Sequence, residues 1–216
     1  MRRGLLLDLD GTLVDSAADL AESLNDLRAE LGHDPLPLEQ VLTMVGEGVG
    51  KLVERGLADG PHETDLARHT SRLMALYGPR VTRKTRPYPG VPETLLALLA
   101  DGWHLGICTN KPEALARKVL DELDLAKHFA AVTGGDSFPR RKPDPSHPRA
   151  ALVQMACPAE HAVFVGDSQI DLETARSAGL PVVLVAYGYA KSPAEELGAD
   201  AVISRFEDLP GVLAQL

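Results

Sequence analysis

Short apolar runs alternate with longer amphipathic stretches along most of the chain. The apolar runs predict strands at Leu5–Leu7, Trp103–Cys108, Phe129–Thr133, Ala162–Val165, Pro181–Ala186 and Ala201–Ile203. Apolar residues recur at helical spacing over Val91–Ala100, Pro112–Leu123, His147–Ala156 and Leu172–Ala178. Strands that alternate with helices in this rhythm predict a parallel sheet with helices on both faces. We therefore expect an α/β fold with a Rossmann-like core.

Residues 16 to about 80 break this rhythm, because no strand is evident there. The sequence predicts helices over 16–32, 38–45, 50–58 and 63–78, the first with Ser16 as a plausible N-cap. The stretch TRPYPGVPE at 85–93 is rich in proline and predicts a returning linker. We expect a core domain of residues 1–15 and 82–216, with a small helical cap domain of residues 16–81 inserted after the first strand.

Polar residues follow three of the predicted strands. Asp8 and Asp10 follow the first strand, Thr109 and Asn110 the second, and Asp167 follows the run AVFV. In open parallel sheets, ligands bind beyond the carboxyl ends of the strands. We therefore expect these residues to meet in one cleft.

Asp8 and Asp10 place two negative charges close together. Positions i and i+2 of an extended segment point the same way, so the two carboxylates repel each other. With Asp167 they would form an all-oxygen site that suits Mg²⁺, and Gly11 would let the backbone turn close to a ligand. The alternative is a solvated turn at the end of a strand.

Composition narrows the class of protein. The 216 residues are 44% hydrophobic and 25% charged, and the net charge of -9 argues against a nucleic-acid or membrane-surface binder. Cys108 and Cys157 lie in apolar contexts that suit reduced thiols. No apolar run is long enough for a membrane span or a signal peptide, so we expect a cytoplasmic protein. For the oligomeric state, we expect a monomer or a homodimer.

Four segments carry a more specific signal. They are DLDGTLVDS at 8–16, ICTNK at 107–111, RRKPDP at 140–145 and GDSQIDLETARSAG at 166–179. In this order and at these intervals, they resemble the four motifs of the haloacid dehalogenase superfamily, and the resemblance covers essentially the whole chain. It implies a hydrolase of phosphate esters with that family's fold.

The resemblance also implies catalytic roles. Asp8 would be the nucleophile that forms an aspartyl-phosphate, and Asp10 would be the general acid and then the general base. Thr109 and the backbone N–H of Asn110 would hold the phosphoryl oxygens. Lys142 would neutralise charge on the nucleophile and the phosphoryl group.

The same resemblance implies a magnesium site. Mg²⁺ would bind the Asp8 carboxylate, the backbone carbonyl of Asp10 and Asp167, and Asp171 would be a further ligand or a partner of the ligands. Each residue also has an ordinary structural interpretation. Thr109 or Asp171 could cap the helix that follows it, and three cations of one loop could be solvated surface charges, namely Lys142, Arg140 and Arg141.

The predicted cap suggests the substrate. Residues 35–58, the stretch VDSAADLAESLN at 14–25 and the stretch VLVAYGYA at 183–190 resemble the corresponding parts of bacterial phosphoglycolate phosphatases. Backbone N–H groups near Gly46 and Gly48 could bind a small carboxylate, although these glycines could also form a simple interhelical turn. The leading hypothesis is therefore a Mg²⁺-dependent phosphatase that converts 2-phosphoglycolate to glycolate and phosphate.

Several alternatives stay open. A phosphatase of broad specificity for sugar phosphates and other small phosphates would use the same residues, as would a β-phosphoglucomutase-like enzyme. A phosphonoacetaldehyde hydrolase would use a cap lysine as a Schiff base, for which Lys51 is the candidate. Dehalogenases of the superfamily lack the second aspartate, so Asp10 disfavours dehalogenation. A silent phosphate-binding module is a further alternative, disfavoured by the full set of acids.

Overall fold

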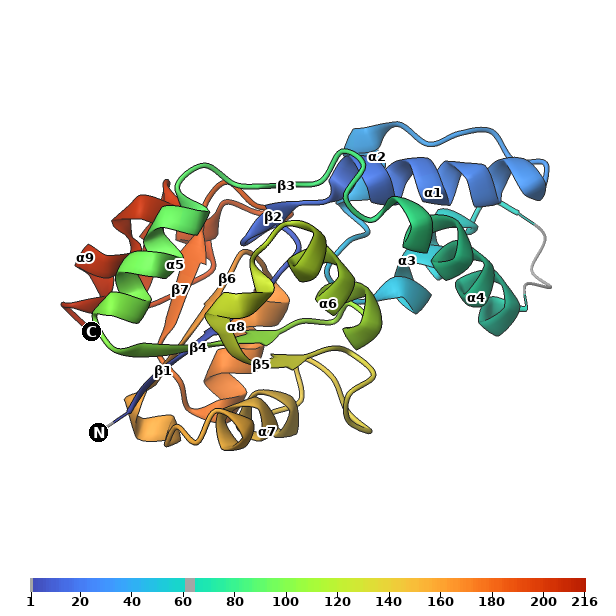
Figure 1. The fold of residues 1–216 in the computed structure, drawn as a ribbon. Coiled ribbons are helices and arrows are strands. Elements are labelled where there is room, and N and C mark those ends of the chain that lie inside the picture. Colours follow the sequence, from blue (N-terminus) through green and yellow to red (C-terminus); the bar gives the residue numbers. More distant parts are fainter. Residues whose placement is uncertain (1, 61–64) are drawn as a thin grey trace.

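A computed structural model describes residues 2–60 and 65–216, and in these ranges a six-stranded parallel sheet forms the centre of the larger part of the molecule (Figure 1). The strand order is β5–β4–β1–β6–β7–β8, and every neighbouring pair is parallel. The strands are β1 (Arg3–Leu7), β4 (Trp103–Cys108), β5 (Phe129–Thr133), β6 (Ala162–Gly166), β7 (Val182–Val185) and β8 (Ala201–Ile203). The predicted parallel α/β fold is therefore confirmed.

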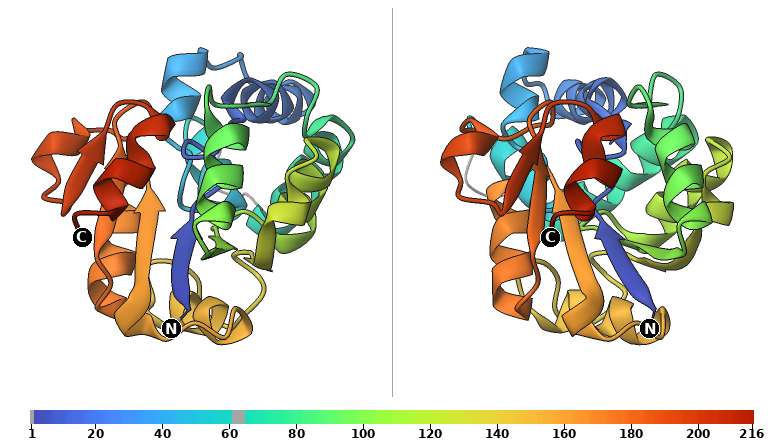
Figure 2. Two further views of the ribbon diagram at one scale, coloured as in Figure 1. Left: turned by 60° about the vertical axis from the view of Figure 1, so that its left-hand side comes forward. Right: turned by 90° about the vertical axis from the view of Figure 1, so that its left-hand side faces the viewer.

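Helices cover both faces of this sheet (Figure 2). Successive residues of a strand face opposite sides, so Leu5 and Leu7 pack on one face while Leu6 packs on the other. The first face carries α5 (Val91–Ala100), α6 (Glu113–Glu122) and α9 (Leu209–Leu213), and the second carries α7 (Ser146–Gln154) and α8 (Gln169–Ala178). The short helix α9 is absent from the sequence prediction.

The order of the strands marks a position for a ligand. The chain moves from β1 to β4 and β5 on one side, then returns to place β6 on the other side of β1. The chain therefore continues from β1 toward β4 and from β6 toward β7, in opposite directions. This divergence opens a crevice at the carboxyl ends of β1 and β6. Asp8 and Asp167 follow these two strands directly.

In the residues that the structure describes, four α-helices form the second, smaller part, to the right in Figure 1. They are α1 (Ala17–Glu30), α2 (Leu38–Leu42), α3 (Val49–Gly56) and α4 (Leu66–Tyr77). Leu20, Leu24 and Leu27 form the buried stripe of α1. The helix expected over 38–45 ends earlier, at Leu42, and residues 63 and 64 of the helix expected over 63–78 lie outside the described residues, as does residue 1.

A two-stranded antiparallel ribbon joins the two parts. It pairs β2 (Val14–Asp15) with β3 (Arg86–Pro87), and the sequence analysis missed it because two-residue strands leave no periodic pattern. The buried Asp19 of α1 accepts hydrogen bonds from the backbone N–H groups of Lys84 and Thr85. The outgoing and returning segments are thereby fixed side by side, while the division at residues 15 and 82 stays a prediction.

No helix in the described ranges is long and apolar enough to cross a membrane. Cys108 and Cys157 are both buried and unpaired, as expected for reduced thiols.

Candidate active site

Asp8 lies in the crevice between β1 and β6. Its backbone N–H donates to the Val165 carbonyl at 2.9 Å, so the sheet fixes the residue where β1 ends. Its side chain is buried, and the Lys142 ammonium lies 2.9 Å from Oδ1. Lys142 itself is only 3% exposed, so it is a buried cation beneath the site and the solvated-loop alternative is wrong.

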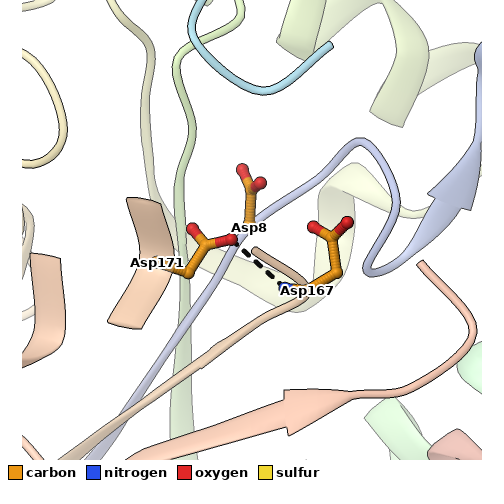
Figure 3. A group of neighbouring side chains, drawn as sticks. All are labelled: Asp8, Asp167 and Asp171. Atoms are coloured by element: carbon orange, nitrogen blue, oxygen red, sulfur yellow. Dashed lines mark hydrogen bonds between the residues drawn. The ribbon is translucent and has the colours of Figure 1, made fainter. Parts of the chain in front are cut away.

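Three carboxylates meet here. One oxygen each of Asp8, Asp167 and Asp171 lies within 4.8 Å of the others, and the Asp8 and Asp167 side chains point in the same direction (Figure 3). Burial, together with the neighbouring carboxylates, raises the pKa of Asp8 to about 6 and that of Asp167 well above its usual range. Asp8 Oδ1 has no well-aligned hydrogen bond within the described ranges. Such a buried all-oxygen cluster could hold a divalent cation.

Asp171 differs from the other two because both of its oxygens are occupied. Oδ1 accepts from Lys142 Nζ at 2.7 Å. Oδ2 accepts from the backbone N–H of Asp167 (Figure 3), and also from the backbone N–H of Ser168 and from Ser168 Oγ at 2.6 Å. With Ser168 it forms the capping box of α8. Asp171 therefore caps its helix and also orients Lys142 and the loop that carries Asp167.

The turn after β1 is shaped around Asp167. Gly11 has φ +85°, and a Cβ at this position would lie 2.5 Å from Asp167 Oδ2, so only glycine fits here. Thr12 Oγ1 donates to Asp167 Oδ1 at 3.3 Å, and the backbone N–H of Tyr189 donates to Oδ2 at 2.7 Å. Tyr189 also reaches the start of the cap, because its hydroxyl accepts from the Ser16 N–H at 2.8 Å and donates to Asp15 at 2.7 Å.

Asp10 faces the cap. Ser16 Oγ donates to its Oδ1 at 2.6 Å. Ser16 occupies the N-cap position of α1, as predicted, but its hydroxyl binds Asp10 and makes no capping hydrogen bond to the helix. Lys111 Nζ donates to both Asp10 oxygens, at 3.0 and 3.1 Å, and to the Tyr77 hydroxyl at 2.8 Å. Burial opposes the charge on Lys111, but Asp10 and Tyr77 outweigh it and raise the pKa of this ammonium. Asp10 is therefore held by partners from both parts of the molecule.

Thr109 and Asn110 lie at the end of β4, and both are buried. Thr109 Oγ1 accepts from the Lys111 N–H at 3.3 Å, whereas α6 begins after Pro112 without a side-chain cap, so the capping alternative for Thr109 is wrong. Asn110 Nδ2 donates to the carbonyls of Gly46, at 3.1 Å, and Lys142, at 3.2 Å. The Asn110 side chain thus connects the cap to the loop that contains Lys142.

A small pocket, partly open to solvent, lies between the cap and the strand ends. Its floor is lined by Asp8, Asp10, Thr109, Asn110 and Lys111, and its roof by Leu20, Val45, Gly46, Gly48, Val49, Leu52 and Tyr77. The structure thus brings four of the predicted site residues, Asp8, Asp10, Thr109 and Asn110, and both cap glycines to one cavity. Asp167, Asp171 and Lys142 lie beside and below its floor.

Lys51, Arg140 and Arg141 do not line this pocket, although the Arg141 guanidinium lies beside Gly48, with Nη1 3.5 Å from where a Cβ would stand. The Lys51 side chain is 42% exposed and pairs with Glu54 at 2.7 Å, the arrangement of a surface lysine and not of a desolvated Schiff-base amine. Arg140 and Arg141 are exposed, in agreement with the surface-charge interpretation.

Sequence reasoning missed four residues of the site. Ser16 and Lys111 are partners of Asp10, Tyr189 is a partner of Asp167, and Tyr77 is a partner of Lys111. Lys111 stands next to Asn110 in the motif ICTNK, so its position after a strand was a usable signal. Nothing in the local pattern around Tyr77 points to the site. Tyr189 lies in the stretch VLVAYGYA at 183–190, which resembles phosphoglycolate phosphatases, but this resemblance gives the residue no role.

Comparison with known proteins agrees with this geometry. A family model described as haloacid dehalogenase-like hydrolase matches residues 5–185. The chain is 43% identical to a phosphoglycolate phosphatase of Rhodospirillum rubrum, over 97% of this chain and 90% of that protein, and 42% identical to one of Caulobacter vibrioides, over 95% and 88%. A crystal structure of a predicted phosphoglycolate phosphatase from Haemophilus somnus superimposes with a TM-score of 0.92 at 30% identity, covering 98% of this chain and 97% of that one.

Proposed function

The chain belongs to the haloacid dehalogenase-like hydrolases, and we propose that within this family it hydrolyses 2-phosphoglycolate to glycolate and phosphate. The observation that carries the proposal is the buried Asp8, which lies beside Lys142 and Asp167 on the floor of a pocket that the cap closes. The identity of about 40% to phosphoglycolate phosphatases over nearly the whole chain supports the choice of substrate.

Asp8 acts as the nucleophile. A carboxylate oxygen of Asp8 attacks phosphorus, the bond from phosphorus to the glycolate oxygen breaks, and an aspartyl-phosphate forms. Lys142, at 2.9 Å from Asp8, stabilises its ionised form and offsets charge on the phosphoryl group. Asp171 holds Lys142 in place from below through the 2.7 Å hydrogen bond.

Asp10 moves the proton. It gives a proton to the departing glycolate oxygen, and it takes one from the water that then attacks the aspartyl-phosphate. Its carboxylate lines the pocket and is oriented by Ser16 and Lys111, so it can reach the ester oxygen of a substrate bound to Asp8. The proton balance closes over one turnover.

The carboxylate cluster fits Mg²⁺. Asp8 and Asp167 would supply carboxylate oxygens, and the Asp10 backbone carbonyl would supply a third ligand, while Asp171 supports the ligands because its oxygens are occupied. When bound, Mg²⁺ would neutralise the buried carboxylates and the phosphoryl oxygens. Burial is the main cause of the raised pKa values of Asp8 and Asp167, and the neighbouring Asp171 carboxylate adds to both, so these shifts support a cation here.

The remaining predicted residues bind the substrate. Thr109 and Asn110 line the floor where the phosphoryl oxygens would lie, and Gly46 and Gly48 bring the cap backbone over the leaving group. Asn110 connects these groups through its hydrogen bond to the Gly46 carbonyl. A cytoplasmic location is part of the proposal, supported by the two buried, unpaired cysteines.

A kinetic panel tests the substrate. We expect kcat/KM with Mg²⁺ to be highest for 2-phosphoglycolate among 2-phosphoglycolate, glucose 6-phosphate, β-glucose 1-phosphate and p-nitrophenyl phosphate. EDTA should abolish turnover, and added Mg²⁺ should restore it. Similar values for all four esters would replace the proposal with a broad-specificity phosphatase, and conversion of glucose 1-phosphate to glucose 6-phosphate would indicate a mutase.

A further inference from the structure

The pocket contains a cation, Lys111, which in the hydrolysis steps only orients Asp10. Among the described residues that line the pocket, Lys111 is the only one with a positive charge, and its side chain is 2% exposed. The other nearby lysine, Lys142, is occupied by Asp8 and Asp171 below the floor. Burying an ammonium is costly, and in the free protein Asp10 supplies its counter-charge.

Lys111 and Tyr77 form a pair across the pocket. Lys111 follows β4 in the core, and Tyr77 ends α4 in the cap. The Lys111 ammonium uses its three N–H groups on the two Asp10 oxygens and the Tyr77 oxygen. The Tyr77 hydroxyl therefore accepts from Lys111, and its own hydrogen has no protein acceptor in the described parts of the chain. Burial raises the pKa of Tyr77, so this hydroxyl remains a donor.

The chemistry of the substrate places a second anion beside this pair. In 2-phosphoglycolate a single methylene group separates the ester oxygen from the carboxylate. The ester oxygen must lie within hydrogen-bond reach of Asp10 for proton transfer, and Asp10 is 3.0 Å from the Lys111 ammonium. The carboxylate therefore lies close to Lys111, and without this cation it would face the Asp10 carboxylate unscreened.

We propose that Lys111 and Tyr77 bind the carboxylate of the leaving group and so select phosphorylated carboxylic acids over neutral phosphate esters. The Tyr77 hydroxyl donates to the carboxylate, and the adjacent ammonium supplies the charge. Because the two residues come from different parts of the molecule, this binding site is complete only when the cap is closed. The inference rests on the proposed function and names the residues that set its specificity.

Two matched substrates test the pair. Ethyl phosphate has the same number of carbon atoms as 2-phosphoglycolate but a methyl group in place of the carboxylate. The measurement is the ratio of kcat/KM for 2-phosphoglycolate to that for ethyl phosphate, in which effects common to both substrates, such as disturbance of Asp10, cancel. The variants are Tyr77→Phe and Lys111→Met, with Lys118→Met on the surface of α6 as the control.

A hydrogen bond to a charged group is worth about 1.5–3 kcal/mol, so Tyr77→Phe should lower the ratio by about tenfold or more. Lys111→Met should lower it further, because it removes the charge itself, and Lys118→Met should leave it unchanged. If wild type prefers 2-phosphoglycolate and both site variants keep the full preference, the carboxylate site is wrong while the proposed function stands. If wild type shows no preference, the proposed substrate is wrong. The Tyr77→Phe variant alone tests the proposed carboxylate site if Lys111→Met does not fold.

Discussion

The floor and the roof of the pocket are built differently. The floor belongs to the core and contains buried charged groups that hold one another, with Lys142 between Asp8 and Asp171 and Lys111 against Asp10. The roof belongs to the cap and is mostly apolar or glycine, with Tyr77 as its polar exception. The buried charges of the cap, Asp19 and Arg28, bind other segments away from the pocket.

This difference assigns different tasks to the two parts. Phosphoryl transfer needs charges at fixed positions, and the network of the floor provides them because each group is held by several partners. An apolar roof recognises size and shape, and it can separate from the floor by breaking few polar contacts. Hydrogen bonds from Asn110 to Gly46 and from Lys111 to Tyr77 cross the pocket. We therefore expect changes in the floor to affect turnover and stability, and changes in the roof to affect substrate binding.

The largest effect should come from the nucleophile. Asp8→Asn removes the attacking carboxylate, so kcat for 2-phosphoglycolate should fall by about 10⁴-fold or more. The fold should survive, because the buried amide is close in shape to the carboxyl group. Steady-state kinetics and thermal unfolding measure the two effects. Asp121→Asn, on the exposed face of α6, is the matched control, and substantial turnover by Asp8→Asn would contradict the assignment.

The second effect concerns the cation of the floor. Lys142→Met leaves Asp8 and Asp171 buried without their counter-charge, so the free energy of unfolding should fall by about 3–5 kcal/mol. Urea unfolding without Mg²⁺ measures it. The control is Lys127→Met, because Lys127 forms an exposed pair with Asp124 and should contribute less than about 1 kcal/mol. Equal stability of the two variants would show that Lys142 does not organise the floor.

The third effect is a pH dependence in the core. Burial, aided by Lys142, lowers the pKa of His147 from 6.5 to about 4, so between these values the unfolded chain binds a proton that the folded protein does not. His147 therefore favours folding fully above pH 6.5, and this contribution is lost as pH falls toward 4. The loss is on the order of 3 kcal/mol.

His147→Leu removes this dependence, and the difference in unfolding free energy between variant and wild type is the quantity to measure from pH 7 to pH 4. Variant and wild type are compared because Asp8 also titrates in this pH range. Its pKa is raised to about 6, so its contribution to stability increases as pH falls, opposite to that of His147. The variant should gain stability relative to wild type as pH falls. A constant difference would mean that His147 has the same pKa in the folded and unfolded protein.

The smallest effect should come from the roof. Gly48 has φ +91°, and a Cβ there would lie 3.2 Å from the Asn110 carbonyl oxygen across the pocket. Gly46 has φ +107° with open space around that position, so Gly46→Ala is a matched control that has backbone strain alone. Each alanine should cost about 1–2 kcal/mol of stability. Gly48→Ala should also raise KM about fivefold above that of Gly46→Ala, if closing the cap becomes harder by about 1 kcal/mol. Equal KM values for the two variants would show that the contact between Gly48 and Asn110 does not affect closing of the cap.

The sequence alone determined most of the core. Each strand of the sheet is a short apolar run between helical patterns, and burial on both faces makes such runs visible without knowledge of their neighbours. Asp8, Asp10, Thr109 and Asp167 could be placed at one edge because they follow parallel strands, and parallel strands end on the same side. The elements that the sequence missed, β2, β3 and α9, are too short to show a period.

Only the tertiary structure decided which partner each charge has. The position of Lys111 after Asn110 does not reveal that it meets Asp10 and Tyr77, because these residues are 101 and 34 positions away in the chain. The motif left Asp171 as either a further ligand or a partner of the ligands, and its contacts with Lys142 and Ser168 favour the second role. Local patterns record which surface a residue buries, whereas the pairing of charges depends on how distant loops meet once the cap lies over the sheet.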